Sequence, residues 1–308
     1  MLRNTILTAG SLLLGICPAF AEDMTLEEIK NGYKRHAALT QFHRWFLLYE
    51  KPAYGIDNQL DILSGDIEVK SGLGEAKGHA AYTKRVEQLP ETWKNAHDVR
   101  STKVTVKPDG TIALEAEVTY LNEGLLPDGG IRTSDLTYMT ELVPTDTALP
   151  LFQSISIAQN SEGTADNFTP AYAKNRVLSL VHYWLTLIED PSRNPQPVEE
   201  ILADSFSLNF SSGAITTFDG FKAWLAGPGS MVTASTHKIG DFTIKETGEN
   251  TYEASMTFDW NGLLPDGKEM TAKTAHTWQI VDDPTERFAR IKTVDVEVLE
   301  PFTPKAAE

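Results

Sequence analysis

The sequence predicts an α+β protein made of two tandem copies of one unit, in which helices cover one face of a strongly curved antiparallel sheet. The first observation is the phrase Gly-Leu-Leu-Pro-Asp-Gly, which occurs at residues 124–129 and again at 262–267. The second is a pair of long helical patterns that superpose at an offset of 139 residues, so that His43 falls on His182. The third is the run of strand patterns that completes each half. Together they indicate a tandem duplication.

The composition limits the classes of function. A chain of 308 residues with 41% hydrophobic residues is long and apolar enough for two domains with separate cores. The formal charge of −16 argues against nucleic acid or an anionic membrane as a partner, because both require basic patches.

Residues 1–21 have the pattern of a secretory signal peptide. Arg3 gives a positive start, an apolar stretch follows, and residues 19–21 form an Ala-Phe-Ala cleavage site. We expect cleavage after Ala21 and a soluble periplasmic or secreted protein without membrane insertion. The only cysteine, Cys17, lies inside this signal, so the mature chain has no thiol chemistry.

Each half opens with a long helix. Apolar residues recur at helical spacing over 25–49 and 172–188, and Pro52 and Pro191 end the two patterns. Shorter helical patterns follow in each half, at 56–63 and 79–89 in the first half and at 198–203 and 218–225 in the second.

Strand patterns make up most of the remainder. Alternating apolar and polar residues predict strands at 66–71, 96–107, 111–122, 132–143 and 151–158, and again at 205–210, 233–245, 251–261, 269–281 and 288–299. The Pro-Asp-Gly core of each repeated phrase has the residues that tight turns require, so each phrase predicts a hairpin connection. We expect domains at 22–160 and 169–308, with a polar linker at 161–168.

This order of elements resembles the NTF2-like superfamily and its SnoaL-like members, which include ketosteroid isomerases and scytalone dehydratases. The most specific match is Ser-Thr-His-Lys-Ile-Gly at residues 235–240, with a weaker version at 96–99. The resemblance implies a cone of curved sheet and helices whose open end holds a small, largely apolar ligand. Such domains commonly pair sheet to sheet, so the tandem chain is expected to form an internal pseudo-dimer with two unequal pockets.

Two repeated His/Glu pairs are candidate ligand-binding residues. His43 and Glu50, like His182 and Glu189, are seven residues apart on a helix, which places them on nearly one face and ~10 Å apart. They either line a cavity or tie the helix to the sheet as a structural pair. A glutamate at a helix C-terminus is opposed by the helix dipole, so each requires a partner, either an arginine or a backbone amide of the sheet.

The resemblance places His97 and His237 where scytalone dehydratase-like members carry a catalytic histidine. His237 is the stronger candidate for an acid–base group, assisted by Glu189 or by His276 on a neighbouring strand. Alternatively, these histidines are half-buried and purely structural. At the offset of 139, the counterpart of His276 is Thr137.

Three further residues are candidates for lining a pocket. Asp135 has Thr274 as its counterpart at that offset, so any role for Asp135 belongs to one pocket only. Trp260 and Trp278 lie on predicted strands and either line the second pocket or fill it. By contrast, the helical positions of Trp45 and Trp184 favour the core.

The sequence has no metal-ligand spacing, phosphate loop or nucleophile elbow, so no metal or cofactor is expected. The preferred hypothesis is a protein that binds a small apolar molecule in one or both cones. One alternative is a cofactor-free isomerase, dehydratase or cyclase that uses His237. The other is a protein-interaction scaffold with filled pockets.

Overall fold

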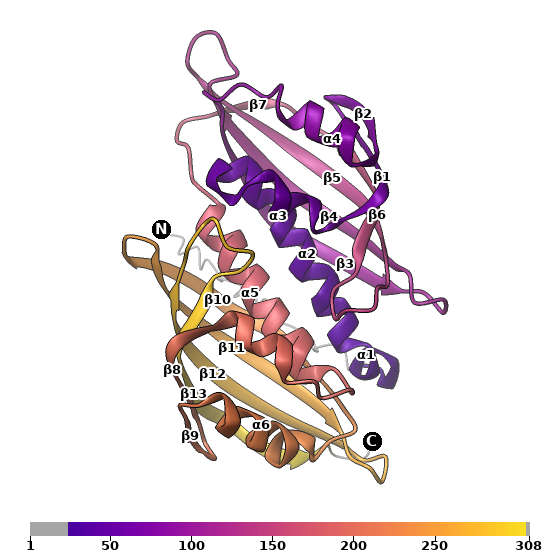
Figure 1. Cartoon of the computed structure of the whole chain (residues 1–308), viewed down its shortest axis with the longest axis vertical. Helices are drawn as coiled ribbons and strands as arrows, with labels where there is room; N and C mark the ends of the chain where they lie inside the picture. The colour runs from indigo at the N-terminus through magenta and orange to yellow at the C-terminus, as the bar shows by residue number, and fades with distance from the viewer. Residues whose placement is uncertain (1–23, 306–308) are drawn as a thin grey trace, which may run out of the picture.

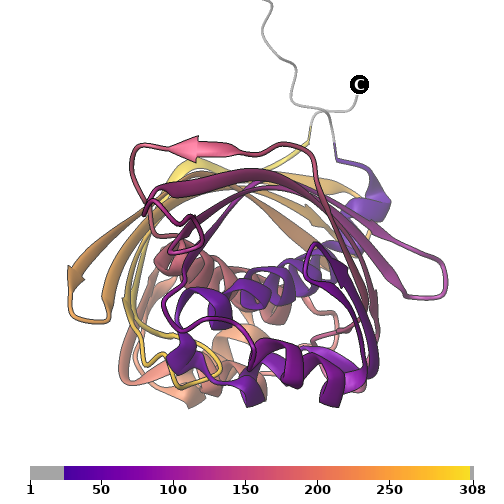
Figure 2. The same cartoon turned by 90° about the horizontal axis from the view of Figure 1, so that it is seen from above.

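Each half of the chain folds around one curved sheet, as the computed structural model of residues 24–305 shows (Figures 1 and 2). The predicted signal sequence, residues 1–21, lies outside the described residues, so export remains a prediction. No helix within residues 24–305 has both the length and the apolar character needed to cross a membrane.

The first half runs from α1 to β7. Its elements are α1 (Leu26–Lys30), α2 (Gly32–Glu50), the short 3-10 helix η1 (Pro52–Tyr54), α3 (Ile56–Leu60), β1 (Leu63–Ser71), β2 (Gly74–Lys77), α4 (Gly78–Val86), β3 (Lys94–Val106), β4 (Ile112–Glu123), β5 (Ile131–Val143), β6 (Leu151–Gln159) and β7 (Gly163–Ala165). Residues 163–165 of the predicted linker therefore form a strand, which pairs with β5 of the first sheet.

The second half repeats this order. Its elements are α5 (Tyr172–Glu189), η2 (Gln196–Ile201), β8 (Leu202–Phe210), β9 (Gly213–Ile215), α6 (Phe218–Ala226), η3 (Pro228–Ser230), β10 (Ala234–Gly248), β11 (Thr251–Leu263), β12 (Glu269–Val281) and β13 (Arg290–Pro304). The α+β prediction is confirmed, and so is the helix, short helix, strand, helix and long-strand order in each half.

The two sheets have equivalent strand orders. The first is β2-β1-β6-β5-β4-β3, with β7 beside β5, and the second is β9-β8-β13-β12-β11-β10. Most neighbours are antiparallel, as predicted, but β1 pairs with β6 and β8 pairs with β13 in parallel. The sheets are therefore mixed. The members of each parallel pair are separated along the chain by one short strand, a helix and three long strands, which is long enough for a parallel connection.

The repeated phrases form equivalent turns. The amide of Gly129 donates to the carbonyl of Leu126 at 3.0 Å, and the amide of Gly267 donates to that of Leu264 at 2.9 Å. Both glycines have positive φ angles, +78° and +84°, which side chains disfavour. The predicted hairpin connections are confirmed between β4 and β5 and between β11 and β12.

The predicted helix at 25–49 is interrupted at one residue. Thr25 and Glu28 form a capping box that starts α1, and Asn31 ends it with a side-chain bond to the carbonyl of Glu27 at 3.1 Å. Helix α2 then starts at Gly32, so α1 can turn away and pack on β10 of the second sheet.

The halves meet mainly through α2 and α5, which lie side by side between the two sheets (Figure 1). The resemblance implied sheet-to-sheet pairing, and in this chain the long helices make the principal contact instead. Each helix faces its own sheet on one side and the opposite helix on the other, which explains why both are buried around most of their circumference.

Candidate functional site

A cavity of about 290 Å³ lies on the inner face of the first sheet, between that face and helices α2 and α4. Most of its lining is apolar or aromatic, and a few polar side chains are interspersed. The lining residues are Trp45, Tyr49, Ser71, Gly72, Leu73, Arg85, Val86, Leu89, Trp93, Asn95, His97, Tyr120, Leu125, Arg132, Leu136, Tyr138, Ile157 and Gln159.

His97 is the one sequence-predicted site residue in this lining, and Glu50 holds its ring. Glu50 Oε1 accepts hydrogen bonds from the backbone N–H of His97 at 2.7 Å and from the ring Nδ1 at 3.1 Å. The glutamate side chain is 1% exposed. The backbone amide is the kind of partner expected for a glutamate at a helix C-terminus, and the pair ties α2 to β3.

The contact with Glu50 determines the tautomer of His97. Because Nδ1 donates to the carboxylate, the neutral ring has its lone pair on Nε2. The ring stacks on Phe46 with centroids 4.7 Å apart and lies 5.0 Å from the Tyr120 ring. A fixed imidazole on the wall of an apolar cavity can accept a hydrogen bond or a proton from a bound molecule.

Asn175, from α5 of the second half, completes this arrangement. Its Nδ2 donates to both Glu50 oxygens at 3.1 Å and to the carbonyl of His97 at 3.0 Å, and its Oδ1 accepts from His43 Nδ1 at 2.9 Å. The orientation of His97 in the first cavity thus depends on a residue of the other half.

The second half contains an equivalent network. Glu189 Oε1 accepts from the backbone N–H of His237 at 2.8 Å and from its Nδ1 at 2.7 Å. His36 takes the place of Asn175, from which it is separated by the repeat offset of 139 residues. Its Nε2 lies 3.1 Å from the His237 carbonyl and 3.5 Å from Glu189, and its Nδ1 lies 2.9 Å from His182. His237, the favoured catalytic candidate, lines neither this cavity nor the interdomain cavity described below.

Comparisons with known proteins find similarity in structure but not in sequence. No family model and no curated protein sequence matches the chain. Solved structures do match, among them a hexachlorocyclohexane dehydrochlorinase (LinA) type 2, at 15% identity over 46% of this chain and 97% of that one, with a TM-score of 0.41. A putative scytalone dehydratase from Novosphingobium aromaticivorans matches at 9% identity over 44% and 89%, with a TM-score of 0.38.

An NTF2-like superfamily protein from Salmonella enterica also matches, at 16% identity over 42% of this chain and 92% of that one, with a TM-score of 0.37. These are similarities of fold over about one half of the chain. The order of helices and strands implied by the sequence resemblance recurs in both halves. Each half is similar, in its order of helices and strands, to the NTF2-like superfamily that the sequence resembles.

The strand pairing of the two halves corrects two residue equivalences. His97 pairs with Tyr120 and His237 with Trp260, whereas Tyr138 pairs with Ala116 and His276 with Met256. The counterpart of His276 is therefore Tyr138, not Thr137, and by the same register that of Asp135 is Lys273, not Thr274. A longer connection in the first half, residues 124–130 against 264–268, shifts the offset between β4 and β5.

His43 and His182 lie between the halves rather than in a cavity. Their rings stack with centroids 5.7 Å apart and an interplanar angle of 8°. Burial lowers the pKa of His43 to about 4, and burial together with neighbouring histidines lowers that of His182 well below its usual value. Both are therefore neutral, and neither they nor Glu50 line either of the two cavities described for this structure.

His276 is also neutral. Burial lowers its pKa to about 3, and Nε2 lies 3.0 Å from Thr274 Oγ1. The rings of His276 and Phe258 pack edge to face, with centroids 4.5 Å apart. His276 is thus a partly buried, neutral histidine packed on Phe258, which makes it a poor proton donor to His237.

The remaining candidates lie outside the first cavity. Asp135 is a surface residue that pairs with Arg100 at 3.0 Å. Trp278 is fully buried in the second core, so it fills the interior of that half rather than lining an open pocket. Trp260 packs against Phe302, with ring centroids 5.0 Å apart.

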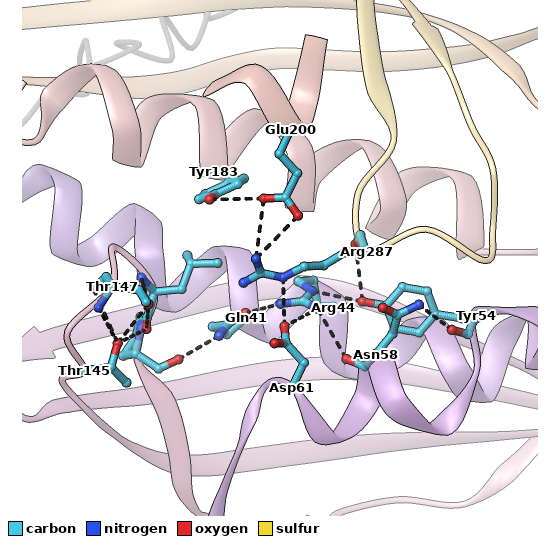
Figure 3. Close-up of polar contacts among 12 residues, drawn as sticks. Gln41, Arg44, Tyr54, Asn58, Asp61, Thr145, Thr147, Tyr183, Glu200 and Arg287 are labelled. Carbon is cyan, nitrogen blue, oxygen red and sulfur yellow. Dashed lines mark hydrogen bonds and ion pairs between the residues drawn. The ribbon is translucent and has the colours of Figure 1, made fainter. Parts of the chain in front are cut away.

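A larger cavity of about 450 Å³ lies between the halves, but its chemistry is polar. Figure 3 shows Arg287 reaching between the halves: Nε donates to Asp61 at 2.8 Å, and Nη1 lies 3.4 Å from Glu200. Arg44 Nη2 also donates to Asp61, at 2.9 Å. Burial opposes ionisation of Asp61, yet the two arginines hold its pKa below the usual value. The two arginines and the two carboxylates neutralise one another. Because Asp61 lies in the first half and Arg287 and Glu200 lie in the second, these ion pairs link the halves.

Several residues that line the cavity were not predicted from the sequence, although the alternation of residues along a strand could have identified some of them. Asn95 lies two residues before His97 on β3, and Tyr120 faces His97 across the β3–β4 pair. Alternation from a candidate histidine therefore identifies Asn95. No comparable signal identifies Tyr49, because the helix that carries it is buried on nearly all sides.

Among residues 24–305, no group of three or more histidine, cysteine, aspartate or glutamate side chains is arranged to hold a metal ion.

Proposed function

We propose that this protein binds one small, largely apolar molecule in the cavity of its first NTF2-like half. The observation that carries the proposal is the cavity itself: about 290 Å³, lined mainly by aromatic and aliphatic side chains and bordered by a fixed histidine. Ligand pockets generally combine an apolar wall with a few well-placed polar groups.

The volume limits the ligand. An engineered cavity of roughly 150 Å³ holds benzene, so a cavity of twice that size suits a molecule of one or two rings. The polar groups on the wall include Asn95, which accepts from the Tyr120 hydroxyl at 2.7 Å. Together with His97, they provide hydrogen-bonding partners for a polar substituent on such a ring.

Titration with 2-naphthol, a neutral two-ring fluorophore, tests the proposal. We expect saturable binding to the natural chain. Leu136→Trp places an indole in the cavity and should abolish binding. Met139→Trp is the matched control, because Met139 lies on the same strand and is 59% exposed outside the cavity. Absence of binding, or equal loss in both variants, would contradict the proposal.

The second candidate function is cofactor-free acid–base catalysis in the same cavity, favoured by the contact between His97 and the buried Glu50 carboxylate. The unprotonated Nε2 is the group that would remove a proton from a carbon next to a carbonyl. This replaces His237 by His97 in the role predicted from sequence, because the cavity lies at His97.

Proton exchange tests the catalytic candidate without knowledge of the substrate. In D₂O, the two-ring ketone 2-tetralone should exchange its α-protons faster with protein than in buffer alone. His97→Gln should remove the acceleration, whereas His237→Gln, at the equivalent position of the other half, should retain it. Exchange no faster than in buffer would rule out this chemistry and leave the binding proposal intact.

A further inference from the structure

The charge of the cavity lining is opposite to that of the chain. The chain has 43 acidic and 27 basic residues, yet the described lining contains two arginines, Arg85 and Arg132, and neither an aspartate nor a glutamate. A basic group in an apolar cavity favours an anionic ligand, because the interaction is stronger away from bulk water.

The two arginines differ in how their charges are used. Arg132 donates from Nε to Glu162 at 2.7 Å and from Nη2 to Gln159 at 2.8 Å, so a carboxylate already neutralises it. Arg85 donates from Nη1 to the Gly74 carbonyl at 3.2 Å. Within residues 24–305, no carboxylate lies within ion-pair distance of Arg85.

Arg85 and Tyr49 both line the cavity, and the arginine charge affects the tyrosine hydroxyl. Burial raises the pKa of Tyr49 to about 12, and the nearby Arg85 charge opposes that rise. The Tyr49 hydroxyl lies 2.6 Å from that of Tyr82, which also receives a hydrogen bond from Gln59 at 3.2 Å. When Tyr82 donates to Tyr49, the Tyr49 hydroxyl proton is available to a ligand.

The second half lacks this pair of groups. At the helix offset of 139 residues, Arg85 corresponds to Trp224 and Tyr49 to Ile188. Trp224 packs against Phe210 with centroids 4.8 Å apart and belongs to the rim of the second core. The second half therefore has neither an arginine at the position of Arg85 nor a tyrosine at the position of Tyr49.

We propose that the ligand is a small ring acid whose carboxylate binds Arg85, assisted by the Tyr49 hydroxyl, while its apolar body lies against the aromatic wall. This inference rests on the proposed ligand-binding function and narrows it to one chemical class.

Two probes of the same shape and different charge test this inference by calorimetric titration. 2-Naphthoate is anionic at pH 7.5, and 2-naphthamide is neutral. The natural chain should bind 2-naphthoate at least about tenfold more tightly, the effect of one hydrogen-bonded charge. Arg85→Met should bring the two affinities together, and Arg85→Lys should restore part of the preference.

Arg132→Met is the matched control, because it removes an arginine of the same lining whose charge is already paired, and it should retain the preference. Equal affinity of the natural chain for both probes would overturn the acidic-ligand inference and leave the binding function standing. A preference that survives Arg85→Met would overturn the role of Arg85. Failure of both probes and of 2-naphthol to bind would contradict the proposed function itself.

Discussion

Replacing Asn175 by leucine is expected to weaken the junction between the halves more than any surface change. Asn175 is 1% exposed and makes four hydrogen bonds, to His43, to both oxygens of Glu50 and to the carbonyl of His97. Leucine retains the bulk of the side chain and removes every one of these bonds. The His43 Nδ1–H then lacks its acceptor, and the Glu50 carboxylate lacks two of its contacts.

The magnitude follows from the burial of these partners. A buried polar group without a partner costs about 1–3 kcal/mol, and a buried charge that loses donors costs more. We therefore expect Asn175→Leu to lower the free energy of unfolding by about 3–5 kcal/mol. The adjacent Lys174 supplies the control: it also crosses between the halves, to Asp98 at 2.6 Å, but both side chains are exposed. Lys174→Met should cost no more than about 1 kcal/mol.

Urea unfolding at pH 7.5, followed by tryptophan fluorescence, measures both values. The natural chain should unfold in one transition, since the buried network belongs to both halves. A loss below about 1 kcal/mol for Asn175→Leu, or a loss equal to that of Lys174→Met, would refute the reasoning that this network holds the halves together.

Two further predictions concern acid stability and close packing. The pKa values of His43 and His276 are lowered to about 4 and about 3, so the unfolded chain binds more protons below pH ~6.5 and stability falls from there towards pH 4. Each histidine contributes at most about 1.4 kcal/mol of unfolding free energy per pH unit. His276→Phe should therefore flatten the dependence of unfolding free energy on pH, and an unchanged slope would contradict the acid-stability prediction. Gly32→Ala would place its Cβ in steric conflict with Thr236 Oγ1 and should cost about 1–3 kcal/mol by thermal unfolding. Gly65→Ala, with nothing within 4 Å, should be nearly neutral, and equal losses would contradict the packing argument.

Local patterns were sufficient to predict most of the fold. The two long helices end at Glu50 and Glu189, close to the prolines that predicted their ends. Asn31 escaped prediction because its capping bonds depend on side-chain geometry rather than on the apolar period. The short strands β2, β7 and β9 contain only three or four residues each, too few to show alternation.

The candidate site was predicted less well, for a physical reason. Repetition of His43 and Glu50 in the second half identified residues that the two halves share, and such residues stabilise the junction. The lining of the first cavity includes positions where the halves differ, as at Arg85 and Trp224, and a search for repeats does not select those positions. The contact of His97 with Glu50 also requires the register of β3 against α2, which the sequence does not reveal.

The central claim is that the first half of the chain holds an open ligand cavity. A crystal structure of the full chain with 6-bromo-2-naphthol tests it most directly, because anomalous scattering locates the bromine. The account predicts one bromine site, inside the cavity bordered by His97, Tyr120 and Tyr138. Bromine in the second half or between the halves, with the first cavity empty, would contradict it.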